Sequence, residues 1–131
     1  MTPRDTQRLI GVHPKLIAAI ETVFDEMDAD KTPMFVVEGL RTYARQVELY
    51  AQGRTTVGPI VTYKDGVTHK SNHQPKADGL GYAVDCAFIG PQPFDQRHPW
   101  EVYGIRLEAQ GIVWGGRWTM KDLPHAELEQ G

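Results

Sequence analysis

The chain has 131 residues, of which 40% are hydrophobic, and this length and composition fit a single domain over residues 1–131. Its 14 basic and 17 acidic residues give a formal net charge of −3, so it lacks the excess of Lys and Arg that binding to nucleic acid requires. Cys86 is the only cysteine, which excludes an internal disulfide and a cysteine-rich zinc site. We expect a monomer that binds no nucleic acid.

The N-terminus is polar over its first eight residues and runs into only a short apolar patch, which does not fit a signal peptide. No uninterrupted apolar run approaches the ~20 residues that span a bilayer. We therefore expect cytoplasmic synthesis. A target outside the cytoplasm would then require release by another route, such as a separate membrane pore.

Two regular elements are predicted before residue 40. Apolar residues recur at three- and four-residue spacing from 15 to 27, which predicts an amphipathic helix that begins near His13 and Pro14. Met34–Val37 is a β-branched and aromatic run followed by Gly39, a pattern typical of a buried strand.

A second helix is predicted over residues 44–51, with Thr42 as its candidate N-cap and Gly53 as its end. Residues 52–72 are polar and rich in turn-forming residues, so we expect an irregular surface loop there. Long loops of this kind often carry binding residues.

The second half of the chain contains three further predicted strands, over residues 82–89, 112–114 and 123–128. Strand alternation places Asp85 and Cys86 on opposite faces, so Cys86 is expected to be a buried core thiol. The same alternation places His125 and Glu127 on one face of the last strand.

A third helix is predicted over residues 99–111, and its apolar side comprises Val102, Tyr103, Ile105, Leu107 and Ala109. The expected fold class is therefore α+β, with a small antiparallel sheet packed against about three helices.

Two clusters contain residues that suit a metal site: His73 with Asp85, and Asp122 with His125. Neutral imidazole and carboxylate oxygen both suit zinc, and three protein ligands leave the open position of a catalytic site. Spacing alone does not separate this reading from surface or hydrogen-bonded histidines, because the chain has no His-Glu-x-x-His helix.

Six segments complete the pattern and follow one another from about residue 36 to residue 128: Glu38-Gly39-Leu40-Arg41-Thr42; Ala44-Arg45-Gln46 to Gly53-Arg54-Thr55; Ser71-x-His73; Gly81-x-Ala83-Val84-Asp85; Trp114-Gly115-Gly116; and Asp122-x-Pro124-His125-x-Glu127-Leu128. Together they resemble the zinc peptidases of the D-alanyl-D-alanine carboxypeptidase superfamily. Within it, the chain is most similar to the phage-endolysin branch, the L-alanyl-D-glutamate peptidases.

This resemblance implies a hedgehog/D-Ala-D-Ala carboxypeptidase-like fold and a site for one Zn²⁺. It implies that His73, Asp85 and His125 are the zinc ligands and that Asp122 is the catalytic base. It also implies that Arg41 holds the substrate carbonyl and its developing oxyanion, a role that suits a permanently charged guanidinium.

Four further residues are candidates near the site. Ser71 is a candidate for substrate binding and is equally a turn residue. Trp114 and Trp118 either line the cleft or close the hydrophobic core beneath it. Glu127 is a candidate acceptor for an imidazole N–H.

The chain departs from the family pattern at two places. Residues 74–80 intervene between His73 and the Gly-x-Ala-x-Asp run as a short insertion, which puts substrate specificity in question. Ala126 stands where relatives commonly have an aromatic residue, and strand alternation turns it away from the metal.

The function implied is a zinc peptidoglycan peptidase, an endolysin that cleaves the L-alanyl-D-glutamate bond of the stem peptide. One alternative is a D-alanyl-D-alanine carboxypeptidase or dipeptidase with the same metal site. The others are a non-catalytic cell-wall-binding module and a phage structural protein.

Overall fold

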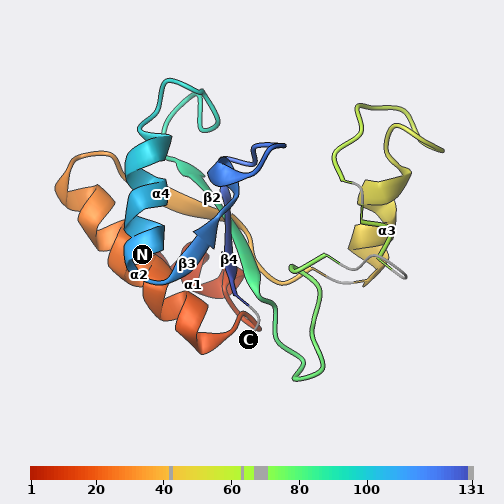
Figure 1. Ribbon diagram of the computed structural model, residues 1–131, viewed down its shortest axis with the longest axis horizontal. Helices are drawn as coiled ribbons and strands as arrows, with labels where there is room; N and C mark the ends of the chain where they lie inside the picture. Colours follow the sequence, from red (N-terminus) through yellow and green to blue (C-terminus); the bar gives the residue numbers. More distant parts are fainter. Residues whose placement is uncertain (42, 63, 67–70, 130–131) are drawn as a thin grey trace.

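A computed structural model describes residues 1–41, 43–62, 64–66 and 71–129 (Figure 1). One antiparallel sheet has the strand order β1-β2-β4-β3, formed by β1 (Met34–Glu38), β2 (Ala83–Phe88), β4 (His125–Leu128) and β3 (Ile112–Trp114). The predicted α+β class and all four predicted strands are confirmed.

Two helices, α2 (Pro14–Ala29) and α4 (Trp100–Ala109), pack together and against the sheet (Figure 1). The predicted start of α2 is confirmed, since His13 is its N-cap and accepts a hydrogen bond from the Lys15 N–H. Pro14 occupies the first turn, where its missing N–H costs nothing.

A short helix, α1 (Pro3–Arg8), lies in the polar N-terminal segment and was not predicted. Thr2 and Asp5 form a reciprocal capping box at its start. The Asp5 carboxylate is buried and also accepts a hydrogen bond from the Val36 N–H at 2.9 Å, which ties α1 to β1.

The core lies between the helices and one face of the sheet. Strand alternation directs Val84 and Cys86 of β2, with Ala126 of β4, into this core. The prediction of a buried thiol is confirmed: Cys86 is fully buried, and burial raises its pKa above the ordinary value.

The predicted apolar side of α4 is only partly correct. Tyr103 and Leu107 are fully buried, whereas Val102, Ile105 and Ala109 face solvent. The helix instead turns Trp100 and Gly104 inward, and Gly104 lies against the Trp114 ring. The spacing of apolar residues could not predict this, because Gly104 has no side chain and is buried only by the Trp114 ring that packs against it.

Helix α3 (Tyr43–Ala51) stands apart from the sheet and helices in Figure 1, together with the chain that follows it. We call residues 43–62 and 64–66 the α3 lobe. The predicted helix is confirmed, and the described part of the loop after it contains no helix or strand. The candidate N-cap Thr42 lies outside the described residues.

No helix in the described ranges combines the length and the apolar character needed to cross a membrane.

Gly104→Ala should destabilise the fold although alanine is the better helix former. A Cβ at position 104 would lie 2.1 Å from Cε3 of Trp114. Helix propensity favours Ala by at most about 1 kcal/mol, whereas overpacking a core costs about 1–3 kcal/mol. We expect a net loss of about 1–2 kcal/mol in the free energy of urea-induced unfolding. The neighbouring Ile105→Ala, on the solvent side, is the control and should change stability by less than about 1 kcal/mol. Wild-type stability in Gly104→Ala would contradict this packing argument.

Candidate metal centre and cleft

The sheet register brings three polar side chains into one row on the face opposite the core. Asp85 of β2 pairs with His125 of β4 on one side and with Glu38 of β1 on the other. A β-bulge between Val36 and Glu38 makes the second pairing possible. Without it, Glu38 would share the core-facing side of Val36, two residues away.

His73 is held in place by the backbone between β1 and α3. Its carbonyl accepts a hydrogen bond from the Arg41 N–H at 2.7 Å, and its own N–H donates to Ser71 Oγ at 3.1 Å. Its ring Nδ1 lies 2.9 Å from the Gly39 carbonyl oxygen, so this nitrogen is the N–H donor. In the neutral ring the other nitrogen, Nε2, then carries the lone pair and is available to a metal ion.

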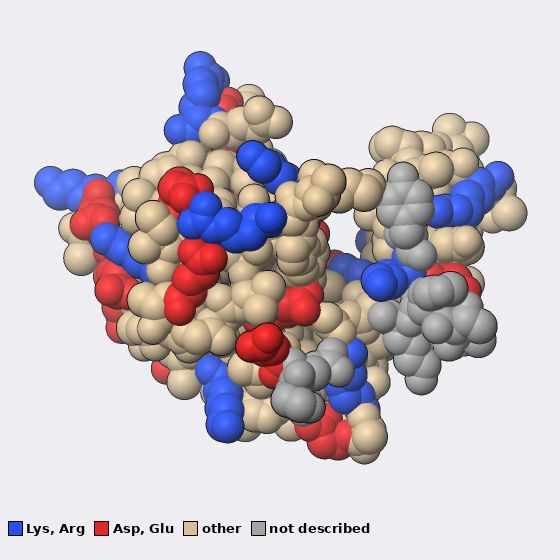
Figure 2. All heavy atoms as spheres, viewed as in Figure 1, with Lys and Arg blue, Asp and Glu red and all other residues tan. Residues whose placement is uncertain are grey.

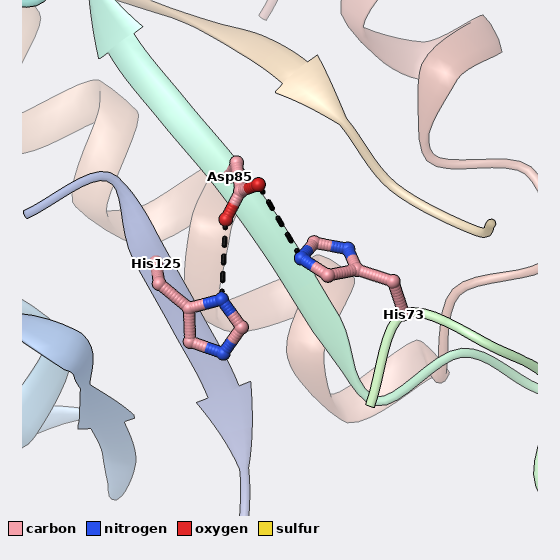
Figure 3. A group of neighbouring side chains, drawn as sticks. All are labelled: His73, Asp85 and His125. Atoms are coloured by element: carbon pink, nitrogen blue, oxygen red, sulfur yellow. Dashed lines mark hydrogen bonds and ion pairs between the residues drawn. The ribbon is translucent and has the colours of Figure 1, made fainter. Parts of the chain in front are cut away.

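His73, Asp85 and His125 converge, as Figure 3 shows. Asp85 Oδ2 lies 3.3 Å from His73 Nε2, and Asp85 Oδ1 lies 3.2 Å from His125 Nδ1. One ligand atom from each residue lies within 4.8 Å of those of the other two. The structure thus brings together the three residues that the family resemblance marks as ligands.

This arrangement fits a divalent metal ion. Two ligand atoms at about 2.1 Å from a tetrahedral ion are separated by roughly 3.4 Å. Each Asp85 oxygen lies close to this distance from one imidazole, and a set with one ligand atom per residue spans no more than 4.8 Å, so the three side chains are near enough to share one ion. Two imidazole nitrogens and one carboxylate oxygen also form a donor set that zinc prefers. The side chains of His73 and His125 are almost fully buried, which limits competition from bulk water.

Asp122 reaches the same site from the turn before β4. Its Oδ2 lies 3.8 Å from His125 Nδ1, and its side chain is 48% exposed. The turn is closed by hydrogen bonds from Asp122 N–H to the Gly115 carbonyl and from His125 N–H to the Asp122 carbonyl. Gly115 must lack a side chain, because a Cβ there would lie 2.5 Å from the Asp122 carbonyl oxygen.

The clustered charges shift the ionisation of these groups. Burial opposes ionisation of Asp85, but hydrogen bonds from His125 and His73 hold its pKa well below the usual range. Burial also opposes protonation of His125, yet its hydrogen bonds to Asp85 and Glu127 raise its pKa to about 9. The pKa of Asp122 is raised by burial and by the neighbouring Asp85 charge. The pocket therefore concentrates negative charge and favours a cation.

Arg41 is held rigidly at the edge of this site. Its Nε and Nη2 donate to the two carboxylate oxygens of Glu38 at 2.9 and 2.8 Å. Its Nη1 donates to Gln46 Oε1 at 2.7 Å and to Ser71 Oγ at 3.4 Å. Gln46 is fully buried and its amide donates in turn to the Lys64 carbonyl, so this network joins Arg41 to the α3 lobe.

A cleft of about 690 Å³ opens above the site, and the molecule is visibly hollowed between its main body and the α3 lobe (Figure 2). The lobe contributes Leu49, Val61 and Lys64 to the lining, and the segment before β4 contributes Trp118, Met120 and Lys121. The three candidate ligands, Asp122 and Arg41 line the same cleft.

Of the two alternatives given for Trp114, the structure agrees with a place in the core beneath the cleft. Its ring is buried in the core against Gly104 and Gly116, and its indole N–H donates to the Leu123 carbonyl. Trp118 lines the cleft instead and packs on His125, with ring centroids 5.0 Å apart. Ser71 lines the cleft but is buried, and its hydroxyl is already used by Arg41 and His73.

Sequence reasoning missed the roles of Glu38 and Gln46. Both belong to motif segments, but nothing in the sequence shows that the bulge turns Glu38 toward Asp85. A glutamine between Arg45 and Val47 of a helix likewise gives no sign of being fully buried.

No protein-family model matches the chain. It is 36% identical over 99 residues to the peptidoglycan L-alanyl-D-glutamate endopeptidase CwlK of Bacillus subtilis (strain 168), an alignment that covers 71% of the chain. The chain spans 59% of the length of that relative.

Two solved structures share the fold. The L-Ala D-Glu endopeptidase ChiX of Serratia marcescens superposes with a TM-score of 0.66 and 28% identity, over 98% of this chain and 89% of ChiX. A variant of the vancomycin resistance D,D-pentapeptidase VanY, in complex with Zn(II), gives a TM-score of 0.62 and 17% identity. That match covers 89% of this chain and 72% of VanY.

Proposed function

We propose that the chain is a member of the D-alanyl-D-alanine carboxypeptidase-like superfamily and a zinc-dependent peptidoglycan peptidase that hydrolyses the L-alanyl-D-glutamate bond. The observation that carries this proposal is the convergence of His73, Asp85 and His125 at the base of an open cleft, with Asp122 beside them. The names of CwlK and ChiX, both L-alanyl-D-glutamate endopeptidases, support the choice of bond.

We propose that His73 Nε2, Asp85 and His125 Nδ1 hold the zinc ion. When bound, zinc supplies Lewis-acid chemistry, which polarises a carbonyl and makes water more acidic. Asp122 is partly exposed to the cleft and lies nearest to His125 Nδ1. Glu127 contacts the opposite ring nitrogen, Nε2. The Asp122 carboxylate is the group placed to accept a proton from attacking water and to return it to the leaving amine.

Arg41 has the charge to stabilise the oxyanion that forms as the peptide bond is attacked. Its hydrogen bonds to Glu38 and Gln46 hold the guanidinium at the cleft wall before substrate arrives. A preorganised donor needs little reorganisation during the reaction, which is the condition under which such groups are most effective.

The cleft also suits an acidic peptide. Lys64 and Lys121 line it from the lobe and from the segment before β4, and neither forms an ion pair within the described ranges. The stem peptide carries free carboxylates, whose charge these two lysines can balance. The exposed Trp118 and Met120 offer apolar surface between the charged groups.

Mass spectrometry of digested peptidoglycan tests the choice of bond. We expect glycan strands on which each cleaved stem peptide is reduced to L-alanine, together with released peptides that have a new N-terminal D-glutamate. Zinc-depleted protein, restored by added Zn²⁺, serves as the control. Release of terminal D-alanine with an intact L-Ala-D-Glu link would support the carboxypeptidase alternative instead. No release of any fragment by zinc-loaded protein would favour a binding module or a structural protein.

Asp122→Asn separates metal binding from proton transfer. The amide keeps the size of the side chain but cannot accept the proton, so we expect kcat to fall by about 10²–10⁴-fold. Zinc content, measured by atomic absorption, should remain at one ion per chain. Asp25→Asn removes an exposed carboxylate on α2 and should leave kcat unchanged. Equal kcat in wild type and Asp122→Asn would remove Asp122 from the mechanism.

We further propose that the activity serves as a phage endolysin, which rests on the ordered motifs shared with that branch of the superfamily. Produced inside a Gram-negative cell, the chain should leave the culture intact until a pore-forming membrane protein is produced with it, and then lyse it. Turbidity measures the result. Lysis of equal rate without the pore would contradict this role, while leaving the peptidase activity untouched.

A further inference from the structure

His125 is held from two sides, and Glu127 provides the second contact. Glu127 Oε1 lies 2.8 Å from His125 Nε2, while Asp85 Oδ1 lies 3.2 Å from His125 Nδ1. The two residues are two positions apart on β4, so strand alternation puts them on one face. Each ring nitrogen of His125 therefore faces a different carboxylate.

The two candidate histidine ligands present different nitrogens to Asp85. His73 presents Nε2, because its Nδ1 is bonded to the Gly39 carbonyl. His125 presents Nδ1, because its Nε2 faces Glu127. In each case the partner on the far side of the ring determines which nitrogen faces the site. For His73 that partner is backbone, whereas for His125 it is a side chain that can be substituted.

Glu127 is itself anchored by the segment that follows His73. Its Oε2 accepts a hydrogen bond from Asn72 Nδ2 at 2.8 Å, and Asn72 Oδ1 accepts one from Lys76 Nζ. Lys76 belongs to residues 74–80, the insertion that departs from the family pattern. A continuous chain of contacts thus runs from the insertion to His125.

We propose that Glu127 is a positioning residue that fixes the ring of His125 with Nε2–H on its carboxylate and Nδ1 toward the metal, and that Asn72 and Lys76 hold Glu127 in place. This inference rests on the proposed zinc site. A carboxylate that accepts the far N–H of a histidine ligand orients the ring and makes the ligating nitrogen more basic. Glu127 therefore acts on metal affinity through the ring of His125.

Zinc affinity, measured by competition with a chromophoric chelator, tests the proposal directly. Loss of such a partner typically weakens metal binding by about 10–100-fold, and we expect this for Glu127→Ala. Glu127→Gln keeps an acceptor without the charge and should lose less. Glu129→Ala removes an exposed carboxylate two residues further along and should bind zinc like wild type. Lys76→Met should weaken binding by less than about tenfold, because it acts through Asn72.

Nitrogen-15 NMR of the histidine rings supplies a readout that simple destabilisation would not change. In zinc-loaded wild type we expect His125 to carry its proton on Nε2 and to bind zinc through Nδ1. In Glu127→Ala the bound and protonated nitrogens should become mixed, and in Glu127→Gln the wild-type pattern should return. Thermal unfolding of each variant in the presence of a chelator identifies any variant that fails to fold. If Glu127→Ala fails, the zinc affinity and ring state of Glu127→Gln, which preserves the size of the side chain, decide the outcome.

The outcomes separate this inference from the function on which it rests. If wild type binds no stoichiometric zinc, the proposed function fails. If wild type binds zinc and Glu127→Ala binds it equally well with an unchanged His125 ring, only the role of Glu127 is overturned.

Discussion

The carboxylate of Asp85 is the interaction on which the site depends. Each of its oxygens contacts a ring nitrogen of one candidate histidine ligand, and it can do so because β2 lies between β1 and β4 in the sheet. On the other side of β2, Val84 and Cys86 are fully buried in the core. A register slip of one residue would exchange these faces and bury a carboxylate in apolar surroundings. The hydrophobic core thus fixes the position of the polar site.

The α3 lobe depends on polar contacts to a greater extent than the rest of the molecule. Gln46 is fully buried and bonds both to Arg41 and to the Lys64 carbonyl. Arg41 in turn joins Glu38 at the end of β1. This buried network is fully paired, and every buried side-chain polar atom in the described residues has a partner. Such networks specify one arrangement, so the wall of the cleft and the guanidinium are positioned together.

Periodicity predicted the strands and α2 because those elements bury continuous apolar faces. It failed where burial has another cause: α1 is stabilised by the capping box of Thr2 and Asp5, and α4 buries Gly104 rather than Ile105. The site residues were found through the order of their motifs, since His73 and His125 are 52 positions apart and meet only through the sheet. The place of Glu38 in the site was not predicted, because a β-bulge reverses the face on which its side chain lies and no residue pattern in β1 indicates that bulge.

The contacts of Lys76 and Asn72 change the role expected for the insertion at residues 74–80. A loop near a cleft would ordinarily be assigned to substrate selection, but Lys76 donates a hydrogen bond to Asn72, which in turn bonds Glu127 beside the candidate ligand His125. His73 does not need this support, because the Gly39 carbonyl already fixes its ring. The two histidines therefore differ in how their orientation is secured. One relies on a backbone carbonyl, and the other on side chains that substitution in the insertion can change.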